Sequence, residues 1–422
     1  MPRLLYTLLL YTLLLFVPIK LLWRGIRQPA YLTHWAERFG FYKLQVKAPL
    51  IWLHCVSVGE TRAAAPLIAE LRQRCPQHQI LLTHATPTGR AAAEQLFGSS
   101  VLRAYLPYDL PGAVGRFLSH FQPEIGLLME TELWFNLIAA CKYRHIPLLL
   151  VNARMSQKSA DGYARIPRLV AQGLRNLSAI TAQTELDAAR LQSLGATKVS
   201  VLGNLKFDVE PPAEAEVRGA QLRATFANRP VFLAASTRSG EEALILEAIA
   251  TANIPDLLTV IVPRHPQRFD EVAALLKNHD IGFMRRSQPA HLSSIPVPTA
   301  IQVLLGDSMG EMFTYYAACD VAFVGGSLLP FGGQNLIEAC AMGKPVLLGP
   351  YTHNFAAATE QAVAVCAAWQ VRDSMELAKA LQRLFGHSQT REAMGQAALR
   401  FSSSAKGATR RIADLVENTL RR

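Results

Sequence analysis

The sequence predicts an α/β protein built from two doubly wound parallel sheets. Short apolar runs of strand length alternate with helical stretches along most of the chain, as expected for repeated strand–helix units. This pattern stops at a segment that contains Pro211 and Pro212 and then starts again. The 422 residues exceed one ordinary core, and half of them are hydrophobic, so two cores are feasible. Two such halves imply a cleft, with ligands at the carboxyl ends of the strands.

Residues 1–30 are predicted to form an N-terminal membrane anchor. Residues 4–19 are apolar apart from Thr7 and Thr12, a little short of the ~20 residues that span a bilayer. Basic residues follow this segment, which favours a cytoplasmic location for the rest of the chain. No small-residue cleavage site follows, so we expect an uncleaved helix. It could span the membrane or lie in its interface, and a buried soluble helix is the alternative.

The charge of the chain points to an anionic partner. The formal charge is +11, and roughly half of the excess lies in the first fifty residues, where Glu37 is the single acid. This position beside the apolar segment favours anionic membrane lipid, and the absence of an RNA-binding signature argues against nucleic acid. The six cysteines are scattered without a Cys-x-x-Cys pair, which argues against a disulfide framework or a structural zinc and fits a reducing compartment.

The first predicted α/β domain covers residues 31–209. Its expected strands are residues 51–56, 79–84, 102–106, 125–129, 148–152, 179–182 and 199–202. Residues 210–216 are predicted to be a linker.

The second predicted domain covers residues 217–422 and repeats the alternation. Its expected strands are residues 231–235, 257–262, 281–284, 301–305, 321–324 and 346–348, with a mostly helical stretch from residue 391 onward.

Polar residues follow several strands of the first domain. Glu60 comes shortly after the first strand, at the start of a helix, where it is either a favourable N-terminal charge or a general base. Glu130 and Glu132 follow another strand, and two acids exceed what a helix cap requires. Lys206 follows the last strand and could neutralise a leaving phosphate or a substrate carboxylate.

A glycine-rich turn in the second domain predicts a nucleotide site. Four glycines follow the strand at residues 321–324, and a helix is expected from Asn335 to Met342. Backbone N–H groups of this turn and helix could bind a phosphate, and Glu338 could bind the hydroxyls of a ribose. The alternative is a tight turn that only packs the helix on the strand.

Two further stretches of the second domain follow strands. Arg264 and His265 lie between two prolines, and residues 306–312 could offer backbone groups to a base or a ribose. No Walker A motif is present, and no Gly-x-Gly-x-x-Gly opens the first strand–helix turn, which weakens ATPase and dehydrogenase interpretations. Metal-binding spacings such as His-Glu-x-x-His are absent from the sequence.

Taken together, these motifs resemble the 3-deoxy-D-manno-octulosonic-acid (Kdo) transferases. The resemblance rests on the anchor segment and on Ser57-Val58-Gly59-Glu60, Met129-Glu130-Thr131-Glu132-Leu133-Trp134, Asn152-Ala153-Arg154, Gly203-Asn204-Leu205-Lys206-Phe207-Asp208, Pro263-Arg264-His265-Pro266, Gly306-Asp307-Ser308-Met309-Gly310-Glu311 and the Gly-Gly-Gln-Asn-Leu-Ile-Glu segment ending at Glu338. It implies the GT-B glycosyltransferase architecture. It also implies transfer of Kdo from CMP-Kdo to a lipid A precursor at the cytoplasmic face of the inner membrane, without cofactor or metal.

The resemblance also implies roles for particular residues. Glu60 would be the catalytic base, and Glu130 and Lys206 would support the transition state. The residues implied to hold CMP are Arg264, His265, Met309, Gly310, Glu311, Asn335, Leu336, Ile337 and Glu338. Ser308 and Phe135 depart from the family pattern, where threonine and proline are common. Two alternatives are a GT-B enzyme with a UDP-sugar donor and a catalytically inert, membrane-anchored nucleotide-binding or scaffold protein.

Overall fold

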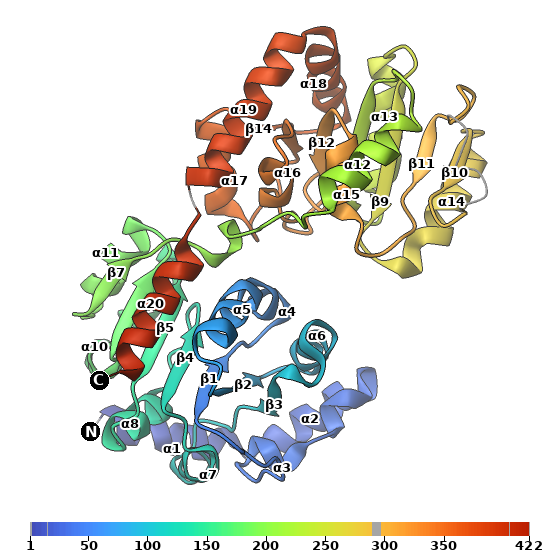
Figure 1. The fold of residues 1–422 in the computed structure, drawn as a ribbon. Coiled ribbons are helices and arrows are strands. Elements are labelled where there is room, and N and C mark those ends of the chain that lie inside the picture. The colour runs from blue at the N-terminus through green and yellow to red at the C-terminus, as the bar shows by residue number, and fades with distance from the viewer. Residues whose placement is uncertain (1, 15, 289–296, 405, 422) are drawn as a thin grey trace. The chain divides into compact units, whose positions relative to one another are not determined.

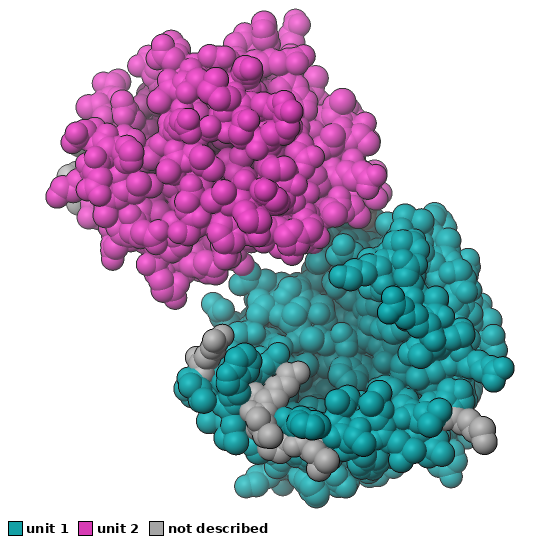
Figure 2. Space-filling model, turned by 180° about the vertical axis from the view of Figure 1, so that it is seen from behind, with its two compact units in different colours: residues 1–208, 405–422 teal, residues 209–404 magenta. Residues whose placement is uncertain are grey.

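The computed structural model describes the whole chain except residues 1, 15, 289–296, 405 and 422 (Figure 1). The chain divides into two compact units, coloured separately in Figure 2. Unit 1 comprises Met1–Asp208 and Ala405–Arg422, and unit 2 comprises Val209–Ser404. Each unit is a parallel sheet covered by helices on both faces (Figure 1).

The sheet of unit 1 has seven strands in the order β3-β2-β1-β4-β5-β6-β7. The strands are β1 (Leu50–His54), β2 (Gln79–His84), β3 (Leu102–Tyr105), β4 (Ile125–Met129), β5 (Leu148–Ala153), β6 (Ala179–Ala182) and β7 (Val199–Val201). β1 and β4 are buried at every residue, as expected for central parallel strands covered on both faces. The order reverses direction beside β1, so the carboxyl ends of β1 and β4 form the edge where ligands bind in doubly wound folds.

Helices and short 3-10 turns connect these strands. They are α1 (Pro2–Leu14), α2 (Val17–Arg27), η1 (Pro29–Leu32), α3 (Trp35–Arg38), α4 (Val58–Ala63), α5 (Ala65–Arg74), α6 (Pro87–Phe97), η2 (Gly98–Ser100), α7 (Pro111–Phe121), α8 (Phe135–Tyr143), α9 (Gln157–Tyr163), α10 (Pro167–Asn176), α11 (Glu185–Ser193), η3 (Leu205–Phe207) and α20 (Ala408–Leu420).

The sheet of unit 2 also has seven strands, in the order β10-β11-β9-β8-β12-β13-β14. They are β8 (Val231–Thr237), β9 (Leu258–Pro263), β10 (Phe283–Arg285), β11 (Val303–Leu305), β12 (Val321–Val324), β13 (Val346–Leu348) and β14 (Ala368–Gln370). The helices and turns are α12 (Ala215–Ala224), α13 (Glu241–Ala252), η4 (Pro266–Arg268), α14 (Phe269–Asn278), α15 (Met312–Ala318), α16 (Ile337–Ala341), α17 (Ala356–Ala364), α18 (Ser374–Gly386) and α19 (Ser388–Ser404). The predicted strands are thus confirmed in both units, and β14 was not predicted.

The C-terminal helix corrects the predicted domain assignment, because α20 belongs to unit 1 and not to the second domain (Figure 1). Asp208, at the end of the first unit, accepts hydrogen bonds from the N–H groups of Gly407 and Thr409 and so caps α20. Ile412 and Val416 join the core beneath α5. The local sequence pattern predicted the helix itself, but it could not show that α20 packs on residues about 200 positions earlier in the chain.

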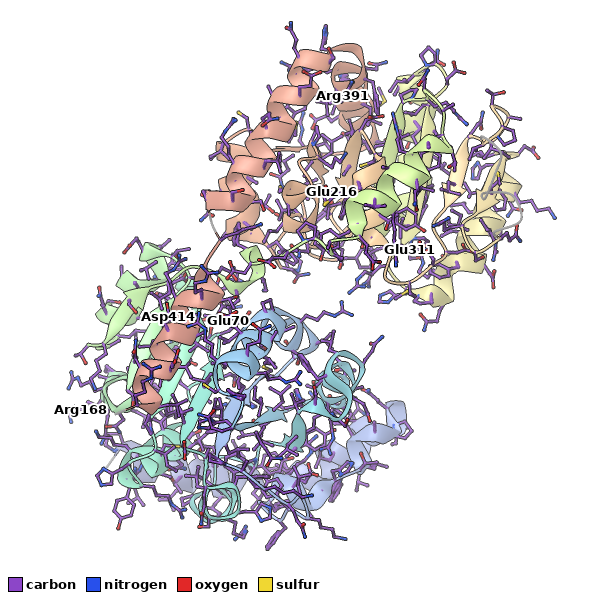
Figure 3. All side chains as sticks on the ribbon, viewed as in Figure 1. Glu70, Arg168, Glu216, Glu311, Arg391 and Asp414 are labelled. Atoms are coloured by element: carbon purple, nitrogen blue, oxygen red, sulfur yellow. The ribbon has the colours of Figure 1, made fainter. Side chains whose placement is uncertain are left out.

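Charged residues hold α20 on the surface of α5. Arg74 of α5 forms ion pairs with Glu70 on its own helix and with Asp414 of α20, two residues labelled in Figure 3. Arg411 also donates to the backbone carbonyl of Leu202 at 2.8 Å. These polar contacts and the buried apolar face of α20 together fix the position of α20 on unit 1.

The predicted N-terminal anchor is two helices, α1 and α2, instead of one continuous helix. Across the part of the chain that the structure describes, no helix is both long and apolar enough to cross a bilayer.

Candidate active site

Glu60 lies in the first turn of α4, directly after β1. The Ser57 hydroxyl caps this helix by accepting from the Glu60 N–H at 3.3 Å. In return, the Glu60 carboxylate accepts from the Val56 N–H at 2.7 Å and from the Ser57 hydroxyl at 2.9 Å. This reciprocal arrangement resembles a capping box. The local hydrogen bonds of Glu60 therefore agree with the first interpretation, a favourable charge at a helix N-terminus.

The electrostatics of Glu60 also fit a general base. Burial raises the pKa of Glu60 to about 7, and the negative charges of Glu130 and Glu132 act in the same direction. The hydrogen bonds from Val56 and Ser57 oppose this rise. A carboxyl group with a pKa near the working pH can both accept and release a proton efficiently. The helix-capping and catalytic interpretations are thus compatible.

Glu130 and Lys206 meet at the same edge of the sheet. Glu130 follows β4 and adopts a left-handed backbone conformation, with φ of 57°. Lys206 lies in η3, after β7, and its Nζ is 3.5 Å from Oε1 of Glu130. Both side chains are about one-fifth exposed, at 22% and 23%. The sequence prediction that Glu60, Glu130 and Lys206 lie at strand ends is confirmed, and the pair of Glu130 and Lys206 adds a direct contact.

Asn152, part of one of the motifs named above, has a positioning role that the sequence did not reveal. It is fully buried at the end of β5, with φ of 53°. Its Oδ1 accepts from the Leu205 N–H at 3.0 Å, and its carbonyl accepts from Nε2 of Gln183 at 3.0 Å. Gln183 accepts in turn from Nδ2 of Asn204, whose Oδ1 accepts from the Lys206 N–H at 3.0 Å. This chain of bonds fixes the turn that carries Lys206.

Arg264 and His265 connect the ends of three adjacent strands in unit 2. Arg264 follows β9 and donates from Nε to Oε1 of Gln334, which lies beyond β12, at 3.0 Å. The imidazole Nε2 of His265 lies 3.1 Å from Nη1 of Arg238, which follows β8. Burial and the charges of Arg238, Arg264 and Arg268 lower the pKa of His265. A neutral histidine can therefore accept a hydrogen bond from Arg238.

The residues Met309, Gly310 and Glu311 form the turn after β11. Met309 is exposed, and Gly310 has φ of 82°. Glu311 accepts from Nη2 of Arg286 at 2.9 Å and from the Ser308 hydroxyl. Burial opposes ionisation of Glu311, but the bonds from Arg286 and Ser308 win and lower its pKa. This turn leads into α15, which packs against α16, the helix that carries Glu338.

Asn335 and Glu338 form a local pair at the start of α16. Nδ2 of Asn335 donates to Oε1 of Glu338 at 3.1 Å, and its Oδ1 accepts from the Ile337 N–H at 3.1 Å. The helix begins at Ile337, two residues later than predicted, and Glu338 lies in its first turn as predicted. Leu336 and Ile337 are completely buried, so only their backbone groups can reach a ligand.

The backbone amides of the glycine-rich turn, predicted to bind a phosphate, bind a carboxylate of the protein. The buried carboxylate of Glu241 accepts from the N–H groups of Gly326 at 2.6 Å, Ser327 at 2.9 Å and Leu328 at 2.9 Å. It also accepts from the Arg238 N–H at 2.8 Å. These three amides of the turn therefore bind an anion of the protein itself and not a phosphate, whereas phosphate binding at the start of α16 stays a prediction. The signal for this clamp in the sequence is the pair of acids, Glu241 and Glu242, in the first turn of α13.

Among the described residues, no three His, Cys, Asp or Glu side chains gather in a way that could hold a metal ion.

Comparisons with known proteins show the family of the chain. Residues 33–209 match the family described as 3-deoxy-D-manno-octulosonic-acid transferase (kdotransferase). The chain is 44% identical to the 3-deoxy-D-manno-octulosonic acid transferase of Bordetella pertussis, and the match covers 100% of both chains. It is 38% identical to the enzyme of the same name from Haemophilus influenzae, with 94% of each chain covered.

Solved structures support the fold. The UDP-GlcNAc 2-epimerase of Neisseria meningitidis superposes with a TM-score of 0.58 and 17% identity, covering 87% of this chain and 100% of the epimerase. MurG of Acinetobacter baumannii superposes with a TM-score of 0.56 and 14% identity, covering 88% and 99%. These likenesses show two parallel-sheet α/β domains of the kind found in GT-B glycosyltransferases. The family match and the identity to the two transferases show that the chain belongs to the 3-deoxy-D-manno-octulosonic-acid transferase family of glycosyltransferases.

Proposed function

We propose that this glycosyltransferase moves Kdo from CMP-Kdo to the lipid A precursor (lipid IVA), inverts the anomeric configuration and releases CMP. The observation that carries the mechanism is the Glu60 carboxyl, whose pKa is raised to about 7 by burial and by the charge of Glu130, the partner of Lys206. The names of the relatives support Kdo as the sugar that is transferred.

In the proposed reaction, Glu60 takes the proton from a hydroxyl of the acceptor glucosamine. The hydroxyl oxygen then attacks the anomeric carbon of Kdo, and the bond to CMP breaks with its electron pair on the phosphate. Positive charge develops on the sugar, which the negative charge of Glu130 favours, and Lys206 favours the negative charge on the phosphate. General-base help of this kind contributes typically 10²–10⁴-fold.

The CMP site is proposed to lie at the carboxyl edge of the unit 2 sheet. The proposed residues are Arg264, His265, Met309, Gly310, Glu311, Asn335, Leu336, Ile337 and Glu338. Since Glu241 occupies the amides of the glycine-rich turn, Arg264 and Arg238 are the groups best suited to the phosphate. Glu338 is suited to the ribose hydroxyls. With these cations at the phosphate, the proposed reaction uses no metal or other cofactor.

We also propose that α1 and α2 lie in the interface of the inner membrane, on the cytoplasmic face. These helices and Phe16, which precedes α2, expose large apolar side chains, namely Leu4, Leu5, Leu8, Leu9, Tyr11, Leu13, Phe16, Leu22, Trp23 and Ile26. Arg3 and Arg24 are exposed among them, and each basic residue near an anionic surface contributes about 1 kcal/mol. Charge reversal of Arg3 and Arg24 should release the protein from vesicles containing phosphatidylglycerol. Unchanged vesicle binding would contradict interfacial attachment.

The experiment that tests the reaction is mass spectrometry of the product formed from CMP-Kdo and the tetra-acylated precursor. A mass gain equal to one or more Kdo residues is expected, with release of CMP. No gain with CMP-Kdo, but a gain with a UDP-sugar, would favour the alternative of another GT-B enzyme. No turnover with either donor would favour the inert nucleotide-binding protein.

A further inference from the structure

An apolar groove of about 500 Å³ lies between α1 and the start of α10. One wall is the face of α1 that carries Pro2, Leu5, Tyr6 and Leu9, which are spaced to lie together on a helix. The other wall is the segment Ile166, Pro167, Arg168 and Leu169. The volume falls within the roughly 300–1,000 Å³ typical of small-molecule sites. The lining is almost entirely apolar, so the shape and chemistry suit a hydrocarbon chain.

The groove is attached to the same sheet edge as the catalytic residues. The Tyr6 hydroxyl donates to Oδ2 of Asp109 at 2.8 Å, and the ring of Tyr6 packs edge-on against Phe135 at 5.2 Å. Asp109 also accepts from the N–H groups of Asn136 at 3.0 Å and Leu137 at 2.8 Å. These residues open α8, the helix that follows β4. The wall of the groove formed by α1 is therefore held near the carboxyl end of β4 through Tyr6 and Asp109.

Tyr163, at the end of α9, connects the groove to the acidic cluster electrostatically. Burial raises the pKa of Tyr163, and the charge of Glu132 raises it further. Tyr163 in turn acts on Tyr6, whose pKa is raised by burial and by Asp109. Glu132 acts on Glu60 as well. Tyr163 thus lies within electrostatic range of both the groove wall and the acids around Glu60.

We propose that this groove binds one acyl chain of the acceptor lipid while its sugar head lies at Glu60. The inference rests on the proposed function, because it names the part of the acceptor that unit 1 recognises. The exposed guanidinium of Arg168, labelled at the outer side of unit 1 in Figure 3, stands at the rim of the groove, where it can pair with a phosphate of the head group. A groove apolar along its length and cationic at its rim matches a lipid that is apolar in its chains and anionic in its head. Its place beside β4 favours the acceptor over a bulk membrane lipid.

The test compares two acceptors, the tetra-acylated precursor in detergent and the same disaccharide phosphate with all acyl chains removed. Leu9→Gln places an amide in the groove, and Ile166→Trp fills it. Each variant should raise KM for the acylated acceptor roughly tenfold, since each buried methylene contributes about fourfold in affinity. The KM for the deacylated acceptor and kcat should not change. Leu186→Gln is the matched control, because Leu186 is 58% exposed on α11 and Leu9 is 57% exposed on α1.

Calorimetric binding of the acylated acceptor to wild type and both variants gives a readout that needs no turnover. Weaker binding by both groove variants, with Leu186→Gln unchanged, supports the inference even if wild type transfers no Kdo and the proposed reaction fails. Equal KM changes for the two acceptors, or unchanged binding of the acylated one, would overturn it. A loss of vesicle binding without a change in acceptor KM would assign the groove to membrane lipid and would also overturn it.

Discussion

Glu60 in unit 1 and Glu241 in unit 2 occupy equivalent places in the two sheets. β1 and β8 are each the first strand of their unit, and both are central: β1 pairs with β2 and β4, and β8 pairs with β9 and β12. A glutamate in the first turn of a helix follows each strand, in α4 and in α13. The topology therefore places a carboxylate at the same point of both sheets.

The two carboxylates differ in how they are satisfied. Glu241 is completely buried and accepts from four backbone amides. Glu60 is partly exposed and accepts from one backbone amide and one hydroxyl. Burial raises the pKa of both, and the amide bonds oppose the rise. Glu241, whose acceptor sites are filled by backbone amides, stabilises the fold. Glu60 has fewer partners and a pKa of about 7, so it can exchange a proton with substrate.

The neighbouring strands show a related difference. Glu130 follows β4 in a left-handed conformation, whereas Gly325 and Gly326 follow β12, with φ of 70° at Gly326. Glycine adopts this conformation freely and lets its N–H approach Glu241. A glutamate there is strained, and such strain is concentrated at functional sites. The turn after β4 in unit 1 therefore carries the charged side chain of Glu130, whereas the turn after β12 in unit 2 offers backbone N–H groups to Glu241.

The largest expected effect is that of Glu60→Gln. Glutamine keeps the bonds to Val56 and Ser57 but cannot accept the proton, so kcat should fall by about 10²–10⁴-fold. Single-turnover rates with CMP-Kdo and the acylated acceptor measure this change. Glu185→Gln is a matched control, since Glu185 is an exposed acid in the first turn of α11, after β6. Glu60→Gln turnover close to that of wild type would falsify the assignment of Glu60 as the base.

Glu241→Gln should affect stability more than chemistry. The amide cannot satisfy the N–H groups of Gly326, Ser327 and Leu328 as a carboxylate does, so unfolding free energy should fall by on the order of 1–3 kcal/mol. Thermal unfolding followed by circular dichroism measures the loss. Glu247→Gln, at an exposed position of α13, should leave Tm unchanged. A Glu241→Gln protein as stable as wild type would remove the contrast between the two glutamates.

Asn152 offers a smaller and more specific test. Asn152→Gly permits the left-handed backbone but removes the bond to the Leu205 N–H, worth about 1 kcal/mol. The turn carrying Lys206 should loosen, and kcat should fall about fivefold while KM for CMP-Kdo stays constant. Asn152→Asp retains the acceptor oxygen and should restore most of the rate. A Gly variant with unchanged kcat would show that Lys206 does not need this support.

Periodicity predicted the strands of both sheets, because buried parallel strands read as continuous apolar runs. It also placed Glu60, Glu130 and Lys206 at strand ends, because strand ends follow from the same pattern. The clamp of Glu241 on Gly326 joins residues 85 positions apart, and the cap of α20 by Asp208 joins residues about 200 apart. Such pairings depend on how the helices pack on the sheets, which local pattern does not contain.

The most direct test of the contrast between the two glutamates is the pH dependence of kcat/KM. Because the pKa of Glu60 is raised to about 7, the base is lost as pH falls through 7, and kcat/KM at pH 6 should be roughly a tenth of its plateau above pH 8. Glu130→Gln removes one of the charges that raise this pKa, so it should move the rising limb to lower pH. A profile that stays flat between about pH 5.5 and 8.5 in wild type would contradict the account.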